Sequence, residues 1–163
     1  MVRAGNGSSG VNAVGDAPLR DGSVEVSTDP SRLDRHLIHS FLSEESYWAR
    51  GIPLEIVERS IEHSLNFGLY SADGQLAYGR VVTDRATFAL VRDVFVVQDW
   101  RGRGLGTLLM KAVLDHPDLQ GLRRVLLVTR DAARFYRSLG FKPLTRPDRF
   151  LAIERRSKEL YRP

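Results

Sequence analysis

The stretch that decides the fold is residues 94–107, which read V-F-V-V-Q-D-W-R-G-R-G-L-G-T. An apolar run leads into a loop that has glycine at positions 102, 104 and 106, and an apolar helical pattern follows. Glycine lacks a Cβ, so it permits positive φ and lets the main chain approach a ligand closely. Amides in such a loop, together with the positive end of the next helix, bind anions. The stretch therefore predicts a strand, an anion-binding loop and a helix that suit a pyrophosphate group.

The glycine spacing excludes two other nucleotide-binding loops. A P-loop requires a following Gly-Lys-Ser/Thr, which is absent. The dinucleotide fingerprint requires two residues between its second and third glycines, whereas only Leu105 separates Gly104 from Gly106. A plain strand-to-helix turn needs only one glycine. Three glycines beside Arg101 and Arg103 therefore favour a binding loop over a simple turn.

Two motifs, in this order, resemble the GNAT (GCN5-related N-acetyltransferase) family. Residues 96–106 read V-x-x-x-x-R-x-x-G-x-G and match the acyl-CoA signature of that family. Residues 132–141 read A-x-x-F-Y-x-x-x-G-F and match its second signature. The resemblance covers about residues 23–155. It implies a single-domain α/β GNAT fold: a mixed, mostly antiparallel sheet of about six to seven strands, splayed at the cofactor site and flanked by about four helices.

The hydrophobic periodicity gives an element order that agrees with this fold. We expect residues 1–22 to be a disordered leader and residues 23–163 to form the acyl-CoA N-acyltransferase domain. Asp73-Gly74 predicts a hairpin turn. The expected strands are 24–27, 67–71, 75–83, 87–97, 125–129 and one or two around 141–144 and 150–154, and the expected helices are 30–42, one from 53, one from 105 to 116, and 131–139.

Composition narrows the class of protein. The 163 residues, 42% hydrophobic and 27% charged, match one globular domain. The absence of cysteine excludes disulfides, thiolate zinc sites and a cysteinyl acyl-enzyme. No segment approaches the ~20 apolar residues of a membrane span, and the four histidines show no ligand spacing, so we expect a cytoplasmic protein with no metal site and no membrane partner.

Charge is distributed unevenly along the chain. Residues 23–64 are net negative, whereas residues 123–137 and 146–163 are net positive. A nucleic-acid partner is one explanation of the basic half, but no basic helix interleaved with aromatics and no helix-turn-helix pattern is present. A polyanionic cofactor explains the asymmetry equally well, so we expect no nucleic-acid partner.

The resemblance also implies which residues contact acetyl-CoA as acyl donor. Main-chain groups near residues 95–97 would bond the pantetheine arm, and the amides of residues 103–107 would hold the pyrophosphate. Thr129 stands where many relatives carry asparagine, and Arg134, like Arg137, is a candidate for the nucleotide 3′-phosphate. The predicted cofactor set is Phe95, Val96, Val97, Arg101, Gly102, Arg103, Gly104, Leu105, Gly106, Thr107, Thr129 and Arg134.

Acetyl transfer to an amine requires a base and an acid. A lysine-like ammonium has a pKa of ~10.4, so it must lose a proton before it attacks at neutral pH, and the departing sulfur, whose thiol has a pKa of ~8.5, must gain one. Tyr136 of the second motif is the candidate acid, with a structural core tyrosine as the alternative. Many relatives carry a glutamate or histidine on the strand before the glycine loop, at positions that correspond here to Leu90 and Arg92. Asp93 is the carboxylate nearest to these positions and is the candidate base. It is equally well interpreted as a structural carboxylate paired with Arg92 or Arg80.

The acceptor is expected to be the primary amine of a small molecule, and the candidate residues around it are Tyr47, Trp48 and Asp84. Trp48 has an alternative interpretation, since a tryptophan in a loop covers the core at least as often as it binds a ligand. The default interpretation of Asp84 is a solvated surface carboxylate. Three alternatives stay open: a protein or peptide N-acetyltransferase, a non-catalytic acyl-CoA sensor, and a protein-interaction module. The resemblance also suggests a homodimer.

Overall fold

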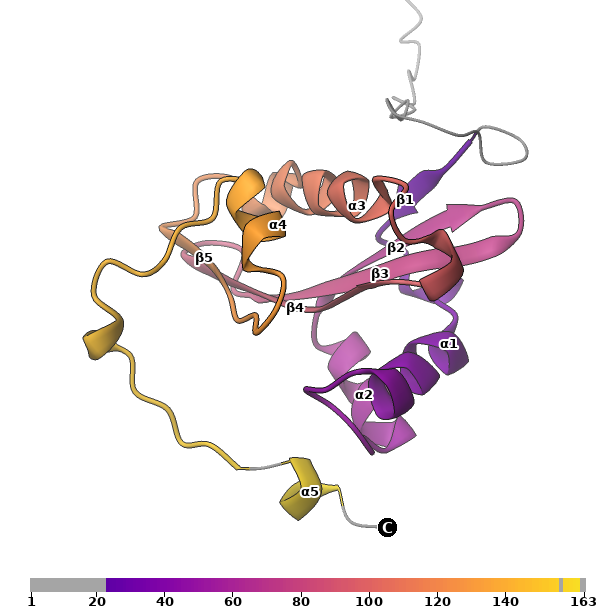
Figure 1. Cartoon of the computed structure of the whole chain (residues 1–163). Helices are drawn as coiled ribbons and strands as arrows, with labels where there is room; N and C mark the ends of the chain where they lie inside the picture. The colour runs from indigo at the N-terminus through magenta and orange to yellow at the C-terminus, as the bar shows by residue number, and fades with distance from the viewer. Residues whose placement is uncertain (1–22, 156, 162–163) are drawn as a thin grey trace, which may run out of the picture.

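The structure, a computed structural model, describes residues 23–155 and 157–161 (Figure 1). The leader predicted for residues 1–22 lies outside the described residues. A mixed sheet of five strands runs through the centre in sequence order, with antiparallel neighbours except for the parallel pair β4 and β5. The strands are β1 (Glu25–Ser27), β2 (Leu65–Ser71), β3 (Gly74–Thr83), β4 (Phe88–Val96) and β5 (Arg124–Leu127).

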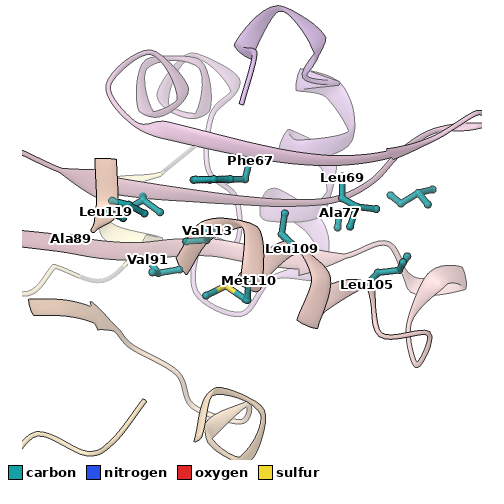
Figure 2. Packing of buried hydrophobic residues seen from close by; sticks show 12 residues of the cluster. Phe67, Leu69, Ala77, Ala89, Val91, Leu105, Leu109, Met110, Val113 and Leu119 are labelled. Atoms are coloured by element: carbon teal, nitrogen blue, oxygen red, sulfur yellow. The ribbon is translucent and has the colours of Figure 1, made fainter. Parts of the chain in front are cut away.

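Helices cover both faces of this sheet. Figure 1 shows α1 and α2 on one face and α3 and α4 on the other, with α5 beyond the end of a long connection. Figure 2 shows α3 packed on the sheet, with Leu109 and Val113 facing Phe67 and Val91. The bounds are α1 (Arg35–Ser40), α2 (Leu54–Glu62), α3 (Leu105–Leu114), α4 (Ala133–Ser138) and α5 (Ser157–Leu160).

The first predicted helix is broken in the structure. Asp29 caps a 3₁₀ turn at Pro30–Arg32, and Leu33 is extended. Asp34 then starts α1 by accepting a hydrogen bond from the Leu37 amide at 2.9 Å. Two aspartates five positions apart each satisfy the free amides of a new helix start, so the chain makes two short helices where periodicity predicts one. A π-helical turn, Phe41–Glu45, continues α1.

The prediction of six to seven strands was wrong in number. Among the described residues the sheet has five strands, and residues 141–144 and 150–154 form none. Pro143 and Pro147 each lack an amide donor, and this part of the chain runs away from β5 toward α5 instead of pairing with it (Figure 1). The hairpin turned at Asp73-Gly74 was confirmed, with Gly74 at a φ of 122°.

The predicted splay was also confirmed. β4 pairs with β5 only over residues 88–91, opposite residues 124–127. Beyond that point β4 follows β3 alone, and its register shifts between Tyr78 and Arg80. Asp93 lies at this irregularity with a φ of 52°, a conformation that few non-glycine residues adopt. The opening between the two parallel strands is where the candidate site lies.

Candidate active site

The glycine loop uses its three glycines in two ways. Gly102 and Gly104 have φ values of 75° and 77°, and a Cβ at either would meet nothing within 4 Å. Gly102 and Gly104 are therefore needed for the left-handed backbone conformation, which glycine adopts without steric cost. A Cβ at Gly106 would instead lie 3.5 Å from Phe135 and 3.7 Å from Val96. The third glycine therefore sits where α3 packs close to α4 and β4.

The N-terminus of α3 is open to an anion. Gly104 occupies the cap position, where no side-chain hydrogen bond is made, so the first-turn amides of Leu105, Gly106 and Thr107 have no side-chain cap. Leu105 buries its side chain in the core and offers only its amide. A cavity of about 320 Å³ faces these amides. It is lined by Val96, Trp100, Arg101, Gly102, Gly104, Leu105, Gly106, Thr107 and Phe135.

The two loop arginines have different surroundings. Arg103 lies 4.7 Å above the Trp100 ring and donates to the Asp99 carbonyl at 3.3 Å. Arg101 lines the cavity and donates from Nε to the Val96 carbonyl at 3.0 Å. Arg101 therefore engages a main-chain group that the family resemblance assigns to the pantetheine arm.

The main chain at the end of β4 is partly engaged as well. The Val97 amide donates to the Leu76 carbonyl at 2.9 Å. Phe95 pairs with Tyr78 of β3, and its ring stacks on the Phe41 ring with 3.8 Å between the ring centroids. Phe95 therefore joins the sheet to the π-helical turn after α1, whereas Val96 faces the glycine-loop cavity.

A second cavity, of about 170 Å³, opens where β4 and β5 diverge. We call it the acceptor pocket. Residues from four separate parts of the chain meet there, among them five of the candidates singled out above. It is lined by Tyr47, Trp48, Val91, Arg92, Asp93, Val94, Leu127, Val128, Thr129, Asp131, Ala132 and Tyr136.

Tyr136 lines the acceptor pocket from α4. Burial raises the pKa of Tyr136 to about 12, and the nearby Tyr47 and Asp131 add to the shift. Its ring contacts Phe135 and Phe141 edge-on, with centroids 5.0 and 5.8 Å away. The phenol is therefore protonated at neutral pH and held in a defined orientation, as a proton donor requires.

Asp93 is only 8% exposed, and both of its carboxylate oxygens are engaged. Trp48 Nε1 donates to one oxygen at 2.9 Å, and Arg80 Nε donates to the other at 2.5 Å. Arg80 also donates to the Ser64 hydroxyl at 3.1 Å. The ion-pair partner is therefore Arg80, whereas Arg92 is exposed and lines the acceptor pocket.

Tyr47 bridges two loops that are distant in sequence. Its hydroxyl accepts a hydrogen bond from the Arg130 amide at 3.0 Å, and the Arg130 guanidinium lies 3.6 Å from its ring centroid. Tyr47 also contacts Trp48 edge-on, at 4.9 Å between ring centroids. Sequence reasoning missed Arg130: the arginine cluster of residues 123–137 was noticed, but nothing in it indicates which member stacks on an aromatic ring.

Some predicted site residues lie elsewhere. The Asp84 carboxylate accepts hydrogen bonds from the hydroxyl and the amide of Thr87 and from the amides of Ala86 and Phe88 in the β3–β4 turn. These bonds, first of all the one from the Thr87 hydroxyl, lower the pKa of Asp84. Asp84 lines neither cavity. Arg134 is exposed on α4 and also lines neither cavity.

Thr129 is in the acceptor pocket, and its hydroxyl accepts from the Ala132 amide at 3.0 Å, just before α4. Its side chain therefore helps to fix the turn that leads to Tyr136.

Residues 62–143 match the family model of the acetyltransferase (GNAT) domain. The chain belongs to the GNAT acetyltransferase family. A crystal structure from Xanthomonas campestris pv. campestris, titled as a "putative acetyltransferase" of this family, is 48% identical to this GNAT protein. The match covers 85% of this chain and 96% of that one, with a TM-score of 0.81. A "putative acetyltransferase" of Gibberella zeae is 29% identical over 144 residues, which are 74% of this chain and 80% of the relative.

A more distant solved structure supports the fold of this GNAT acetyltransferase. Glucosamine-6-phosphate N-acetyltransferase from Arabidopsis thaliana superposes with a TM-score of 0.59 at 16% identity, covering 82% of this chain and 97% of that one. GNAT proteins typically use acetyl-CoA and act on an acyl acceptor. Within residues 23–155 and 157–161, no helix is long and apolar enough to cross a membrane, and no three metal-binding side chains are grouped.

Proposed function

We propose that this chain transfers the acetyl group of acetyl-CoA to the primary amine of a small molecule, by direct attack in a ternary complex. The observation that carries the proposal is the adjacency of the two cavities. Val96 and Phe135 line the glycine-loop cavity, whereas Val94 and Tyr136 line the acceptor pocket. An anion-binding loop and a protonated phenol are thus joined by neighbouring residues of β4 and α4. Residues 23–163 would form this acyltransferase domain, in the cytoplasm.

The coenzyme would lie along the splay with its pyrophosphate at the first-turn amides of α3. Its pantetheine arm would follow β4 past Phe95, Val96 and Val97, as an added strand does. A pantetheine amide at the Val96 carbonyl would replace the Arg101 side chain there and free its guanidinium to meet phosphate. Thr129 would border the thioester end, and Arg134 would meet the 3′-phosphate from the exposed side of α4.

The chemistry then needs two proton movements. The neutral amine attacks the thioester carbonyl, and the C–S bond breaks as the new C–N bond forms. Tyr136 donates its proton to the departing sulfur, since its pKa of about 12 keeps the phenol protonated until that step. Asp93 orients the incoming ammonium, whose proton leaves to Asp93 directly or through water. The Trp48 and Arg80 contacts hold that carboxylate at the pocket wall.

The acceptor pocket supports a small acceptor in preference to a protein. Its volume is about 170 Å³, and Tyr47, fixed by Arg130, lies across two of its loops. Tyr47 and Trp48 offer aromatic faces to an alkylammonium. Asp84 would act only at longer range, as part of the negative potential around the acceptor.

Two measurements test this function. Isothermal titration of acetyl-CoA into tens of micromolar protein should give a saturable heat, and a free-thiol release assay across a panel of small amines should show turnover. Binding without turnover on any amine would identify a sensor. Turnover on peptides alone would replace the small amine with a protein acceptor. The absence of any heat would contradict the whole proposal.

A further inference from the structure

One charged side chain of the acceptor pocket lacks a partner of opposite charge. Three charged residues line the pocket: Arg92, Asp93 and Asp131. Asp93 is paired with Arg80, and an Asp131 carboxylate oxygen lies 3.7 Å from a guanidinium nitrogen of Arg130. Among the residues that the structure describes, the Arg92 guanidinium makes no ion pair, hydrogen bond or ring contact. The pocket therefore carries one positive charge that no carboxylate balances.

A β-bulge brings Arg92 into the same pocket as Asp93. Between two successive pairs of the β3–β4 ladder, β4 has two residues, Asp93 and Val94, where β3 has only Gly79. Consecutive side chains of a regular strand point to opposite faces, and a bulge interrupts this alternation and re-aims a side chain. Asp93 lies in the bulge with its positive φ, and both it and Arg92 line the acceptor pocket. One wall of the pocket thus carries a guanidinium and a carboxylate on consecutive residues.

The position of Arg92 does not stabilise the sheet. Arg92 lies directly opposite Arg80 in the register of β3 and β4, and like charges in opposite positions destabilise a sheet. The Asp93 carboxylate does not offset the Arg92 charge, because its two oxygens accept from Trp48 and Arg80. Arg92 is exposed, so water solvates its guanidinium and a ligand can reach it. These are the properties of a residue that binds an anion in the pocket.

We propose that the acceptor amine carries an anionic group, a carboxylate or a phosphate, and that Arg92 binds this group. This role rests on the proposed function, because it specifies which class of amine the acceptor pocket takes. A planar guanidinium donates two parallel hydrogen bonds to either kind of anion. With the anion at Arg92, the ammonium of the same molecule lies near Asp93. A zwitterionic amine, such as an amino acid, satisfies both charges, whereas a simple alkylamine leaves Arg92 without a partner.

Kinetics on matched pairs of acceptors test this role of Arg92. The pairs are γ-aminobutyrate and its amide, alanine and alaninamide, and aminoethyl phosphate and ethanolamine. The wild type should favour the anionic member of at least one pair by about 10–100-fold in kcat/KM, as expected for a hydrogen bond to a charged group. A preference in the carboxylate pairs alone, or in the phosphate pair alone, identifies the anion. A wild type that favours no anionic member overturns the proposal.

Three variants show whether the preference comes from Arg92. Arg92→Gln should lose it, mainly through a higher KM for the anionic member, and Arg92→Lys should restore part of it, since lysine keeps the charge and lacks the planar fork. Comparing the ratio within each pair between wild type and variant cancels any difference in amine basicity. Arg59→Gln removes an exposed arginine of α2 that lines neither cavity, and it should keep the wild-type ratio. An unchanged ratio in Arg92→Gln overturns the proposal.

Thermal stability excludes a structural role for Arg92. The Tm of Arg92→Gln should equal or exceed that of the wild type, because the substitution removes a like charge opposite Arg80. A Tm lowered by more than about 3 °C would identify Arg92 as a structural residue and would also overturn the proposal.

Binding measured without turnover separates this role from the proposed function. Titration calorimetry with γ-aminobutyrate, alanine and aminoethyl phosphate should give a saturable heat for at least one of them, and Arg92→Gln should bind that ligand at least about tenfold more weakly. If the protein acetylates no amine, the proposed function fails, and this titration still decides whether Arg92 binds the anion. No heat with any of the three ligands, or equal Kd values in wild type and variant, overturns the role of Arg92. Turnover on uncharged amines would leave the acetyltransferase function intact in that case.

Discussion

Replacing Asp93 with asparagine isolates the role of its charge at the splay. Asparagine keeps the size of the side chain and an oxygen for Trp48 Nε1, and it tolerates the positive φ of 52° at this position. What it removes is the negative partner of Arg80. The two side chains are 6% and 14% exposed, so the pair is close to fully buried.

The expected loss of stability follows from that burial. Breaking a buried pair by removing one partner costs about 3–5 kcal/mol, because the remaining charge stays in the interior uncompensated. Because the Trp48 hydrogen bond is retained, we expect Asp93→Asn to lower the free energy of unfolding by about 3 kcal/mol, the low end of this range. For a domain of this size the Tm should then fall by about 6–12 °C. Differential scanning calorimetry measures this directly.

Two further variants make the result decisive. Asp118→Asn breaks the exposed pair with Arg85 and should change the free energy of unfolding by less than about 1 kcal/mol. Asp93→Ala should be less stable than Asp93→Asn by about 1–2 kcal/mol, since alanine is strained at positive φ. A Tm for Asp93→Asn within 2 °C of wild type, or equal stabilities of the two Asp93 variants, would refute the buried-pair reasoning.

Activity separates the two interpretations of Asp93. Assayed well below its Tm, Asp93→Asn should lose about 10²-fold in kcat/KM for the amine if the carboxylate handles the ammonium. If its role is only to hold Trp48 and Arg80 in place, the Tm falls and kcat/KM stays within a few-fold of wild type.

Four further predictions concern Tyr136, Gly104 and Tyr47. Tyr136→Phe should lower kcat by about 10²–10⁴-fold and leave the acetyl-CoA Kd within about twofold; unchanged kcat would remove its acid role. Burial raises the pKa of Tyr136 to about 12, above the unfolded value of ~10. The stability that the protonated phenol contributes to the wild type is therefore present below pH ~10 and falls as the pH rises from ~10 to ~12. Urea denaturation at each pH should show a smaller loss of stability over this range in Tyr136→Phe. Gly104 and Gly121 both have φ above 70° and free space for a Cβ, so Gly104→Ala and Gly121→Ala should lose similar stability. Only Gly104→Ala should weaken acetyl-CoA binding, by about tenfold in titration calorimetry. Equal Kd values for the two variants would place the pyrophosphate elsewhere. Tyr47→Phe removes the acceptor of the Arg130 amide and should raise the KM for the amine several-fold with little change in the KM for acetyl-CoA; a selective rise in the acetyl-CoA KM would contradict its place at the acceptor end.

Local sequence patterns predict part of the candidate site. The positive φ of Gly102 and Gly104 and the start of α3 follow from residues that are neighbours along the chain, so their pattern predicts them. The hairpin at Asp73-Gly74 was predictable for the same reason. Asp93 was a weaker case. Its identity as a candidate came from its place before the loop, but the choice of Arg80 over Arg92 depends on which face of β3 lies opposite the bulge.

The first helix and the last strands show where periodicity misleads. An apolar pattern over residues 30–42 cannot reveal that Asp34 starts a second helix at the expense of the first. Residues 150–154 do alternate as a strand would, yet a strand also requires a neighbour with free main-chain groups. In this fold Phe150 contacts Arg124, Tyr161 packs against the core cluster under α1 and α2, and residues 150–154 do not pair with β5.

The sequence by itself determined the glycine loop, the helix behind it and the tyrosine of the second motif, because these depend on backbone freedom and spacing within a few residues. Only the tertiary structure decided that Tyr47 meets Arg130 across 83 positions, that Trp48 and Arg80 share the carboxylate of Asp93, and that β5 keeps an open edge. The physical reason is that such contacts arise from the path of the whole chain, where strand register and loop closure bring together groups that no local pattern connects.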